Sequence, residues 1–359
     1  MERAAAQGSE THAPGDDATA RLPGYGGKPG SARASARWRN WFFALMLVAA
    51  LVVSVLHRHE IARLVLLAGK ARPGWLVLAV VLQLSTYLSL ALGWQAVLRH
   101  AGHPQPMPRL IRIAFTKLFA DQALPSAGLG GNVVLVDQLM MTGVPRGAAV
   151  AALILSMIGF YAAYMVFAVA MLAMLWLLGH AAPWIAGLVS MFLLVAMAIP
   201  GVALWLRRRG QGPMPRWIAR LSFVRGLLEA VGEAPGELLR NRALIAQVTV
   251  WNALIFLADA ATLLACLRAL GQGGGFGAAY IAFMMASIVI TLGPVPLGLG
   301  SFEATCTAML RLLGVPFEGG FAATMLLRVL TLWLPLLPGL VLMRGAIRPN
   351  RENADSSEG

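Results

Sequence analysis

Three charged residues interrupt long apolar stretches of this 359-residue sequence: Asp259, Glu303 and Arg328. A charge surrounded by apolar chain is costly, so such residues are functional candidates and normally pair with one another. Asp259 and Arg328 each lie near the middle of their stretch, which predicts an ion pair between them, with Glu303 as a competing partner for Arg328. The pair would either contact a polar substrate group or only fix how two helices pack.

Two glycine-rich breaks offer a second kind of chemistry. Residues 124–131 read Leu-Pro-Ser-Ala-Gly-Leu-Gly-Gly, and residues 293–300 read Gly-Pro-Val-Pro-Leu-Gly-Leu-Gly. The helix that follows each break would present unpaired N–H groups and a positive dipole end, which suits a phosphate group. The glycines expected to line this path are Gly128, Gly130, Gly298 and Gly300.

The two helix beginnings differ in their next residues. Asn132 is a neutral potential cap after the first break, whereas Ser301 is followed by Glu303, whose carboxylate would occupy the favourable place beside the second dipole. The first break is therefore expected to be the better anion site. Ordinary helix capping by Asn132 and Ser301 is the structural alternative.

Lys117 and Asp121 lie one turn apart on the helix that enters the first break. Side chains at this spacing share a helix face. They are expected either to line the path of a charged headgroup or to pair only with each other.

Signatures of soluble enzymes are missing from the sequence. His59-Glu60-Ile61-Ala62-Arg63 has Arg63 where a zinc-binding helix needs its second histidine, and no lysine follows the glycine pairs at phosphate-loop spacing. We expect no catalytic residue, no metal site and no cofactor. Cys266 and Cys306 fall in apolar segments and are expected to pack rather than to react.

The elements that must position these residues are apolar helices. The sequence is 58% hydrophobic and only 13% charged, and several apolar runs reach about 20 residues, the length that crosses a bilayer. The pattern predicts an all-α polytopic membrane helix bundle with about six full spans. The predicted spans are residues 40–56, 74–98, 147–178, 184–206, 243–269 and 317–343.

Two further segments, residues 109–141 and 277–313, consist of an apolar helix, a break and a second apolar helix. They predict re-entrant hairpins, because irregular backbone at membrane depth must be buried in protein or line a wet cavity. Gly143-Val144-Pro145 after the first matches Gly314-Val315-Pro316 after the second. The match predicts an inverted repeat with halves at about 109–178 and 277–343.

Charge predicts the organisation and topology of the chain. Residues 1–39 are expected to form a disordered basic tail, residues 40–345 the membrane domain and residues 346–359 a polar tail. A short amphipathic helix is expected near residues 59–70. The net charge of +13 comes largely from arginines between apolar runs, eight of them in residues 207–242, which predicts a cytoplasmic loop rather than nucleic-acid binding. Both termini are then expected to be cytoplasmic in a multi-pass protein of the inner (cytoplasmic) membrane.

The strongest motif is Pro-Val-Pro-Leu-Gly-Leu-Gly-Ser-Phe-Glu at 294–303, followed by Gly314-Val315-Pro316 and Arg328. Through it, roughly residues 40–345 resemble the transmembrane region of lysylphosphatidylglycerol synthases, a flippase-like domain. The first hairpin departs from that family, whose members commonly carry Gly-Glu followed by Arg where this chain has Gly131-Asn132. Met157 also stands at the repeat position of Arg328. The departures indicate a divergent subgroup.

The resemblance implies translocation, or support of modification, of a phospholipid or lipid-linked headgroup bearing an amino acid, sugar or hopanoid. No aminoacyl-transferase domain accompanies the segment, so lysyl transfer is not expected. One alternative is a lipid transferase with Glu303 or Asp259 as general base. Another is a non-catalytic membrane subunit of a lipid- or glycan-modifying complex. The expected partners are a membrane lipid and such a modifying enzyme.

Overall fold

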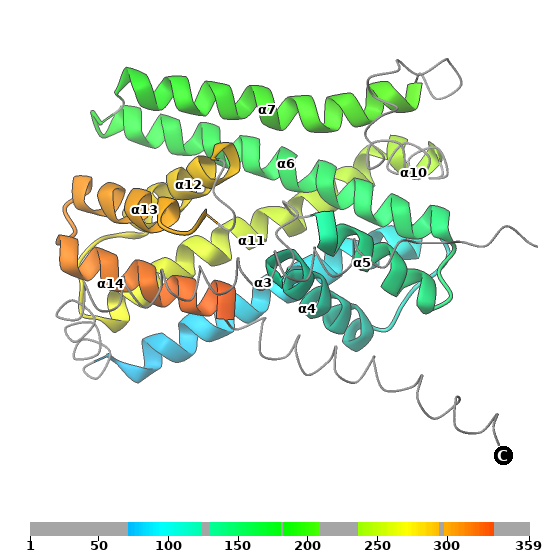
Figure 1. Cartoon of the computed structure of the whole chain (residues 1–359), viewed down its shortest axis with the longest axis horizontal. Coiled ribbons are helices and arrows are strands. Elements are labelled where there is room, and N and C mark those ends of the chain that lie inside the picture. Colours follow the sequence, from blue (N-terminus) through cyan, green and yellow to red (C-terminus); the bar gives the residue numbers. More distant parts are fainter. Residues whose placement is uncertain (1–70, 124–128, 181, 209–235, 294–297, 334–359) are drawn as a thin grey trace, which may run out of the picture. The chain divides into compact units, whose positions relative to one another are not determined.

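The computed structural model describes residues 71–123, 129–180, 182–208, 236–293 and 298–333, and these ranges contain helices and connecting turns but no strand. All of them lie in one compact unit of the chain. Figure 1 shows the arrangement of the helices. They are α3 (Pro73–His100), α4 (Met107–Ala123), α5 (Leu129–Met141), α6 (Arg146–Leu177), α7 (Pro183–Arg208), α10 (Gly236–Arg240), α11 (Arg242–Ala269), α12 (Phe276–Leu292), α13 (Ser301–Leu312), α14 (Phe317–Arg328) and the π-helix η2 (Val329–Trp333).

Three long helices, α3, α6 and α11, are apolar and long enough to cross a membrane. They have 28, 32 and 28 residues. A rise of about 1.5 Å per residue makes each longer than the roughly 30 Å of bilayer hydrocarbon. Local signals set their beginnings: α3 has a proline in its first turn, and the Asn241 side chain accepts a hydrogen bond from the Leu244 N–H at the start of α11. The predicted spans at 74–98, 147–178 and 243–269 are confirmed as helices of this kind.

The other predicted spans have mixed outcomes. Residues 184–206 fall within the helix α7, which contains the apolar segment Pro183–Ala198. Residues 317–333 are helical, but the helix becomes π-helical directly after Arg328. The predicted span at 40–56, the amphipathic helix at 59–70, most of the basic loop and the end of the last span lie outside the described residues.

Both predicted helix–break–helix segments are present as packed helix pairs, α4 with α5 and α12 with α13. The two pairs lie toward opposite ends of the long helices (Figure 1). Each has its own hydrophobic core. One combines α4 and α5 with α10, the first half of α6, the N-terminal part of α11 and the C-terminal part of α3. The other combines α12 and α13 with α14, α7, the second half of α6 and the C-terminal part of α11. The long helices therefore carry one hairpin at each end.

The turns after the two hairpins have the same conformation. Gly143 and Gly314 both adopt a positive φ, 85° and 87°, which L side chains rarely tolerate. Val144 and Val315 each donate a hydrogen bond to a carbonyl five residues back, at 3.3 Å and 2.9 Å. A proline with extended backbone then precedes the next helix in both cases. The Gly-Val-Pro match in the sequence thus corresponds to a shared local structure.

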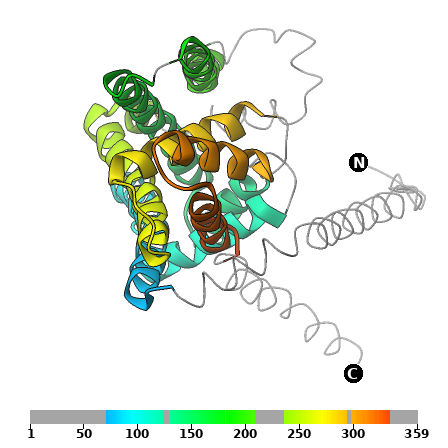
Figure 2. The ribbon, with the colours of Figure 1, turned by 90° about the vertical axis from the view of Figure 1, so that its left-hand side faces the viewer.

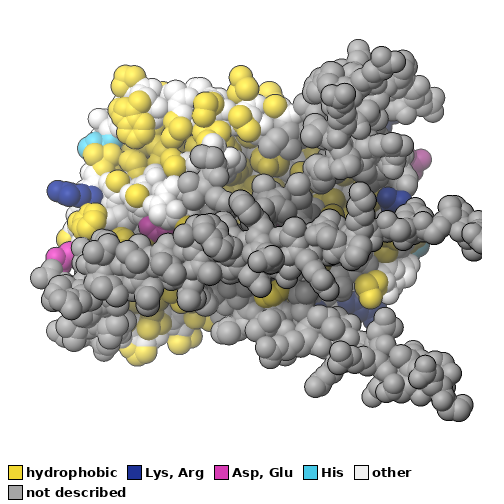
Figure 3. Space-filling model, in the orientation of Figure 1, with side chains coloured by type: hydrophobic (Ala, Val, Ile, Leu, Met, Phe, Trp, Pro, Cys, Tyr) yellow, Lys and Arg dark blue, Asp and Glu magenta, His cyan; other side chains and the backbone are white. Residues whose placement is uncertain are grey.

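Apolar side chains also cover parts of the outer surface. Trp176 on α6, Leu194 on α7 and Val77 on α3 are each more than half exposed. On the face seen in Figure 3, hydrophobic side chains cover the part formed by α6 and α7. Exposed apolar faces of this kind are expected where helices contact lipid.

Close packing of α6 on α11 gives a first prediction. A Cβ added at the buried Gly159 would lie 2.9 Å from Val248 Cγ1 and 3.1 Å from the Thr249 backbone nitrogen. Gly159→Ala should therefore destabilise the fold by about 1–3 kcal/mol through overpacking, seen as a lower midpoint of thermal unfolding in detergent or lipid. The control is Gly187→Ala on α7, where a Cβ meets nothing within 4 Å; equal midpoints for the two variants would contradict the close packing.

Candidate functional site

Glycines shape the turn that precedes α13. Gly298 and Gly300 have positive φ values of 61° and 82°, and a Cβ on Gly298 would overlap the Ile290 side chain of α12. The Ser301 hydroxyl donates to the Gly298 carbonyl oxygen at 3.1 Å. Only glycine tolerates both the positive φ and the close contact with Ile290 at position 298. This tight turn therefore fixes where α13 begins and where its first side chains point.

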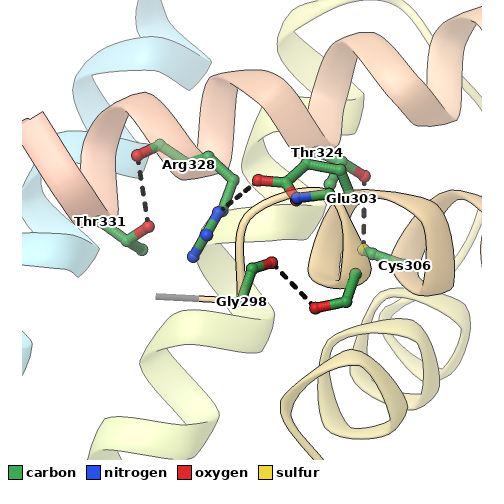
Figure 4. A network of polar contacts seen from close by, with 8 residues as sticks. Gly298, Glu303, Cys306, Thr324, Arg328 and Thr331 are labelled. Atoms are coloured by element: carbon green, nitrogen blue, oxygen red, sulfur yellow. Dashed lines mark hydrogen bonds and ion pairs between the residues drawn. The ribbon is translucent and has the colours of Figure 1, made fainter. Parts of the chain in front are cut away.

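Glu303 bridges the start of α13 and the end of α14. Its Oε2 accepts a hydrogen bond from the Gly300 N–H at 2.7 Å, and its Oε1 accepts one from Arg328 Nε at 2.7 Å (Figure 4). Only 9% of the Glu303 side chain and 11% of the Arg328 side chain are exposed. Both carboxylate oxygens are therefore engaged, one by a helix N-terminus and one by a cation.

Arg328 has a second favourable contact besides the ion pair. Its guanidinium carbon lies 4.9 Å from the centre of the Phe302 ring. A cation over an aromatic face gains about 0.5–2 kcal/mol, more where water is excluded. The π-helix η2 follows Arg328 directly, and Thr331 in it donates to the Arg328 carbonyl oxygen at 3.4 Å. Single-turn π segments inside helices occur frequently at functional sites.

A buried threonine holds the two helices of this site together. The Thr324 hydroxyl on α14 lies 2.8 Å from the Gly320 carbonyl oxygen and 3.3 Å from Cys306 Sγ on α13. Thr324 and Cys306 are both fully buried. This contact keeps α13 and α14 in register, so Glu303 and Arg328 remain opposite each other.

The first hairpin contains the same pattern of bonds. Asp121 Oδ2 accepts from Lys117 Nζ at 2.6 Å, and Asp121 Oδ1 accepts from the Gly131 N–H at 3.0 Å. Gly131 belongs to the first turn of α5, and a Cβ there would overlap the Asp121 carboxylate and the Lys117 carbonyl oxygen. Here too a carboxylate joins a cation to an amide at the beginning of the returning helix.

The first hairpin was expected to be the better anion site because no carboxylate would occupy the beginning of its second helix, and this reason is wrong. The first helix beginning was expected to be free of a carboxylate, but Asp121 reaches it from α4, the other arm of the hairpin. Asn132 is not the cap, because α5 already begins at Leu129. Gly130 lies in the first turn of α5, Gly128 lies outside the described residues, and the cap of α13 is Gly300 rather than Ser301.

The predicted ion pair between Asp259 and Arg328 is also wrong, because the competing partner Glu303 holds Arg328 and no ion pair joins Asp259 to Arg328, both of which the structure describes. Asp259 instead faces α3, where Gln83 and Tyr87 are its neighbours. These two residues were missed by the sequence analysis. A Gln and a Tyr one turn apart within an apolar span were the available signal.

The arrangement is suited to binding an anion rather than to covalent chemistry. Both hairpins pair a cation with helix N-terminal amides, which together match the acceptor oxygens of a phosphate or carboxylate. Cys266 and Cys306 are buried and unbridged. Among the described residues, no three His, Cys, Asp or Glu side chains come together in a way that could hold a metal ion.

Comparison with known sequences places the chain in a family. No curated protein matches it. The profile of the family described as "Lysylphosphatidylglycerol synthase TM region" matches residues 41–339, which include every helix described above. The chain therefore belongs to the family of the lysylphosphatidylglycerol synthase transmembrane region, a family of multi-pass membrane proteins linked to modification or transport of lipid headgroups.

Proposed function

We propose that this protein moves an anionic lipid headgroup across the membrane, with the two hairpins as successive binding sites. The single observation that supports the proposal most is the repeated bridge, Asp121 between Lys117 and Gly131 and Glu303 between Arg328 and Gly300. In each bridge a carboxylate occupies the place that a phosphate oxygen would take. A lipid phosphate that displaces the carboxylate would keep both the cation and the amide hydrogen-bonded.

The predicted inverted repeat gives this proposal its geometry. The hairpins lie toward opposite ends of the long helices, and the turns that follow them share one conformation. Under inverted topology one hairpin opens to each side of the membrane. A headgroup would then move between the Lys117 site and the Arg328 site as it crosses the membrane. In the proposed topology the protein has six spans in the inner membrane and both termini in the cytoplasm.

The two hairpins carry their charges on different elements. Val133 and Met157 stand at the repeat positions of Glu303 and Arg328, and the first hairpin instead has Lys117 and Asp121 on its entering helix. Arg328 is held by a rigid, aromatic-backed pair, whereas Lys117 has a long flexible stem and a more exposed partner. We infer that the Lys117 site captures and releases the headgroup and that the Arg328 site holds it more tightly.

A lipid transferase with Glu303 as its general base is less well supported than transport. A general base needs a free oxygen within reach of the proton that it abstracts. Both oxygens of Glu303 already accept hydrogen bonds, so this residue is poorly placed for the task. Formation of a modified lipid by the purified protein would favour the transferase, and its absence together with headgroup exchange would favour transport.

Reconstitution tests the proposal directly. The full-length protein is placed in liposomes that contain a trace of phosphatidylglycerol with a dithionite-reducible fluorophore. We expect the protein to expose inner-leaflet label to dithionite faster than in protein-free liposomes, and to do so less for labelled phosphatidylcholine. Equal rates with and without protein, repeated with a labelled glycolipid, would count against transport.

A further inference from the structure

A separate polar cluster lies between α3 and α11, the two helices that pack along each other most extensively (Figures 1 and 2). It consists of Asp259 on α11 and of Gln83 and Tyr87 on α3. Gln83 is 5% exposed and Tyr87 3% exposed. Asp259 lies near the middle of α11 in sequence, well away from both helix ends. None of the three residues belongs to either hairpin bridge.

Oxygen atoms in this cluster lack hydrogen-bond partners. Asp259 Oδ1, Gln83 Oε1 and Tyr87 Oη are buried and accept or donate no hydrogen bond within the ranges that the structure describes. The Gln83 side chain lies within hydrogen-bonding reach of Asp259, and Tyr87 is close enough to interact with it electrostatically. A buried polar atom without a partner destabilises the fold. The three atoms are two acceptors and one hydroxyl, so the cluster has fewer donors than its acceptors need.

The charge of Asp259 has no cation opposite it. Among the described residues Asp259 forms no ion pair, and Arg328 on the adjoining α14 is bonded to Glu303. The elements packed against α11 carry these titratable residues: Tyr87, Arg99 and His100 on α3, Arg146, Tyr161 and Tyr164 on α6, Glu237 and Arg240 on α10, Tyr280 on α12, and Glu318 and Arg328 on α14. Tyr164 lies 3.3 Å from the Thr291 hydroxyl, and Tyr280 donates to the Phe167 carbonyl oxygen at 2.7 Å.

A proton is the smallest species that satisfies this cluster. Asp259 Oδ1 and Gln83 Oε1 are both buried acceptors without a bonded donor, and the neighbouring Tyr87 hydroxyl has only one proton to offer the two. One proton added to the Asp259 carboxylate removes its charge and creates an O–H that donates to the Gln83 carbonyl oxygen. No other group changes its protonation in this step. Asp259 is partly buried, with its Oδ1 inaccessible to solvent, and protonation lowers the cost of holding a poorly solvated carboxylate there.

We propose that Asp259 is a proton-binding site positioned by Gln83 and Tyr87, and that its protonation couples headgroup movement to the transmembrane pH gradient. This coupling rests on the transport function proposed above. The helices provide the connection, because α11 packs on α14, which ends in Arg328, and α3 packs on η2, which follows it. An unpaired charge between α3 and α11 favours their separation, and this separation would displace the segment that carries Arg328.

Infrared difference spectroscopy of the full-length protein in lipid tests the proton site without requiring transport. A protonated-carboxyl band should titrate with pH in the wild type, be absent from Asp259→Asn and reappear at a shifted frequency in Asp259→Glu. Gln83→Leu and Tyr87→Phe should move its titration midpoint. The control Thr262→Val, which removes only a hydroxyl bonded to the Ala258 carbonyl oxygen of the same helix, should leave it unchanged. The same titrating band in Asp259→Asn overturns the proposal.

Exchange of labelled phosphatidylglycerol under an imposed pH gradient tests the coupling. A gradient of one pH unit should change the wild-type rate by up to about tenfold and the Asp259→Asn rate hardly at all. A titrating band without any exchange leaves the proton site intact and defeats the transport function. If exchange responds to a sodium gradient but not to a pH gradient, and no carboxyl band titrates, the proton site is refuted and the transport function stands.

Discussion

Arg328→Met should abolish exchange of labelled phosphatidylglycerol and should also destabilise the protein by about 3–5 kcal/mol. The substitution keeps an unbranched side chain about as long as the aliphatic stem of arginine, but it leaves the Glu303 carboxylate, 9% exposed, without its cation. It also removes the guanidinium from the face of Phe302. Because stability and transport would fall together, this single variant does not separate a structural role of Arg328 from a functional one.

The double variant Glu303→Gln with Arg328→Met separates these roles. It removes both charges, while the glutamine carbonyl oxygen can still accept the Gly300 N–H that Glu303 accepts now. Replacing a buried ion pair by neutral groups is often close to neutral in stability, so most of the loss in unfolding free energy should be recovered. Exchange should stay absent, because the cation that binds the phosphate is gone. Recovery of both would show that the pair only fixes α13 against α14.

Arg311→Met is the matched control. Arg311 lies on α13, is exposed and carries the same charge as Arg328. Its loss should change exchange and thermal stability little, since surface charges contribute at most about 1 kcal/mol. Exchange rates normalised to reconstituted protein, and unfolding midpoints in detergent, are the two measurements. An equal loss of exchange in Arg311→Met and Arg328→Met would point to a general effect of positive charge.

Helix positions follow from the sequence because their causes are local. The break at 293–300, the turn at Gly314 and the cap at Asn241 are set by residues within a few positions, and the structure has helix ends where these signals occur. The bond between Glu303 and Gly300 is of the same local kind, three residues apart. Apolar length then predicts which helices can span a bilayer, as α3, α6 and α11 do.

The partners of charged residues do not follow in the same way. Equal depth along two helices suggested that Asp259 meets Arg328, but depth is one coordinate of three, and the rotation and neighbours of each helix decide the rest. Asp121 reaches Gly131, ten residues away, across a break whose path the sequence does not determine. Gln83 meets Asp259 only because α3 packs on α11, a tertiary pairing without a local signal.

Lys117→Met should reduce headgroup exchange about tenfold to a hundredfold, the effect of losing one charged hydrogen bond of about 1.5–3 kcal/mol. Its effect on stability should be much smaller than that of Arg328→Met. Lys117 and Asp121 are 16% and 20% exposed, so solvent screens them, and pairs at this helix spacing contribute only about 0.2–0.5 kcal/mol. Lys117→Arg should restore part of the exchange. Arg112→Met, which removes an exposed charge from the same helix, is the control.

Asp121→Asn decides whether the carboxylate at this site is a placeholder for phosphate. The asparagine carbonyl oxygen can still accept the Gly131 N–H, but it no longer neutralises Lys117. If lipid phosphate displaces Asp121, this variant should bind labelled phosphatidylglycerol more tightly than the wild type, whereas Lys117→Met should bind it more weakly. Equilibrium binding in mixed micelles measures both. A purely structural pair predicts the same direction of change in both variants, because each loses the same ion pair, so opposite signs are the result that ties the first hairpin to the headgroup.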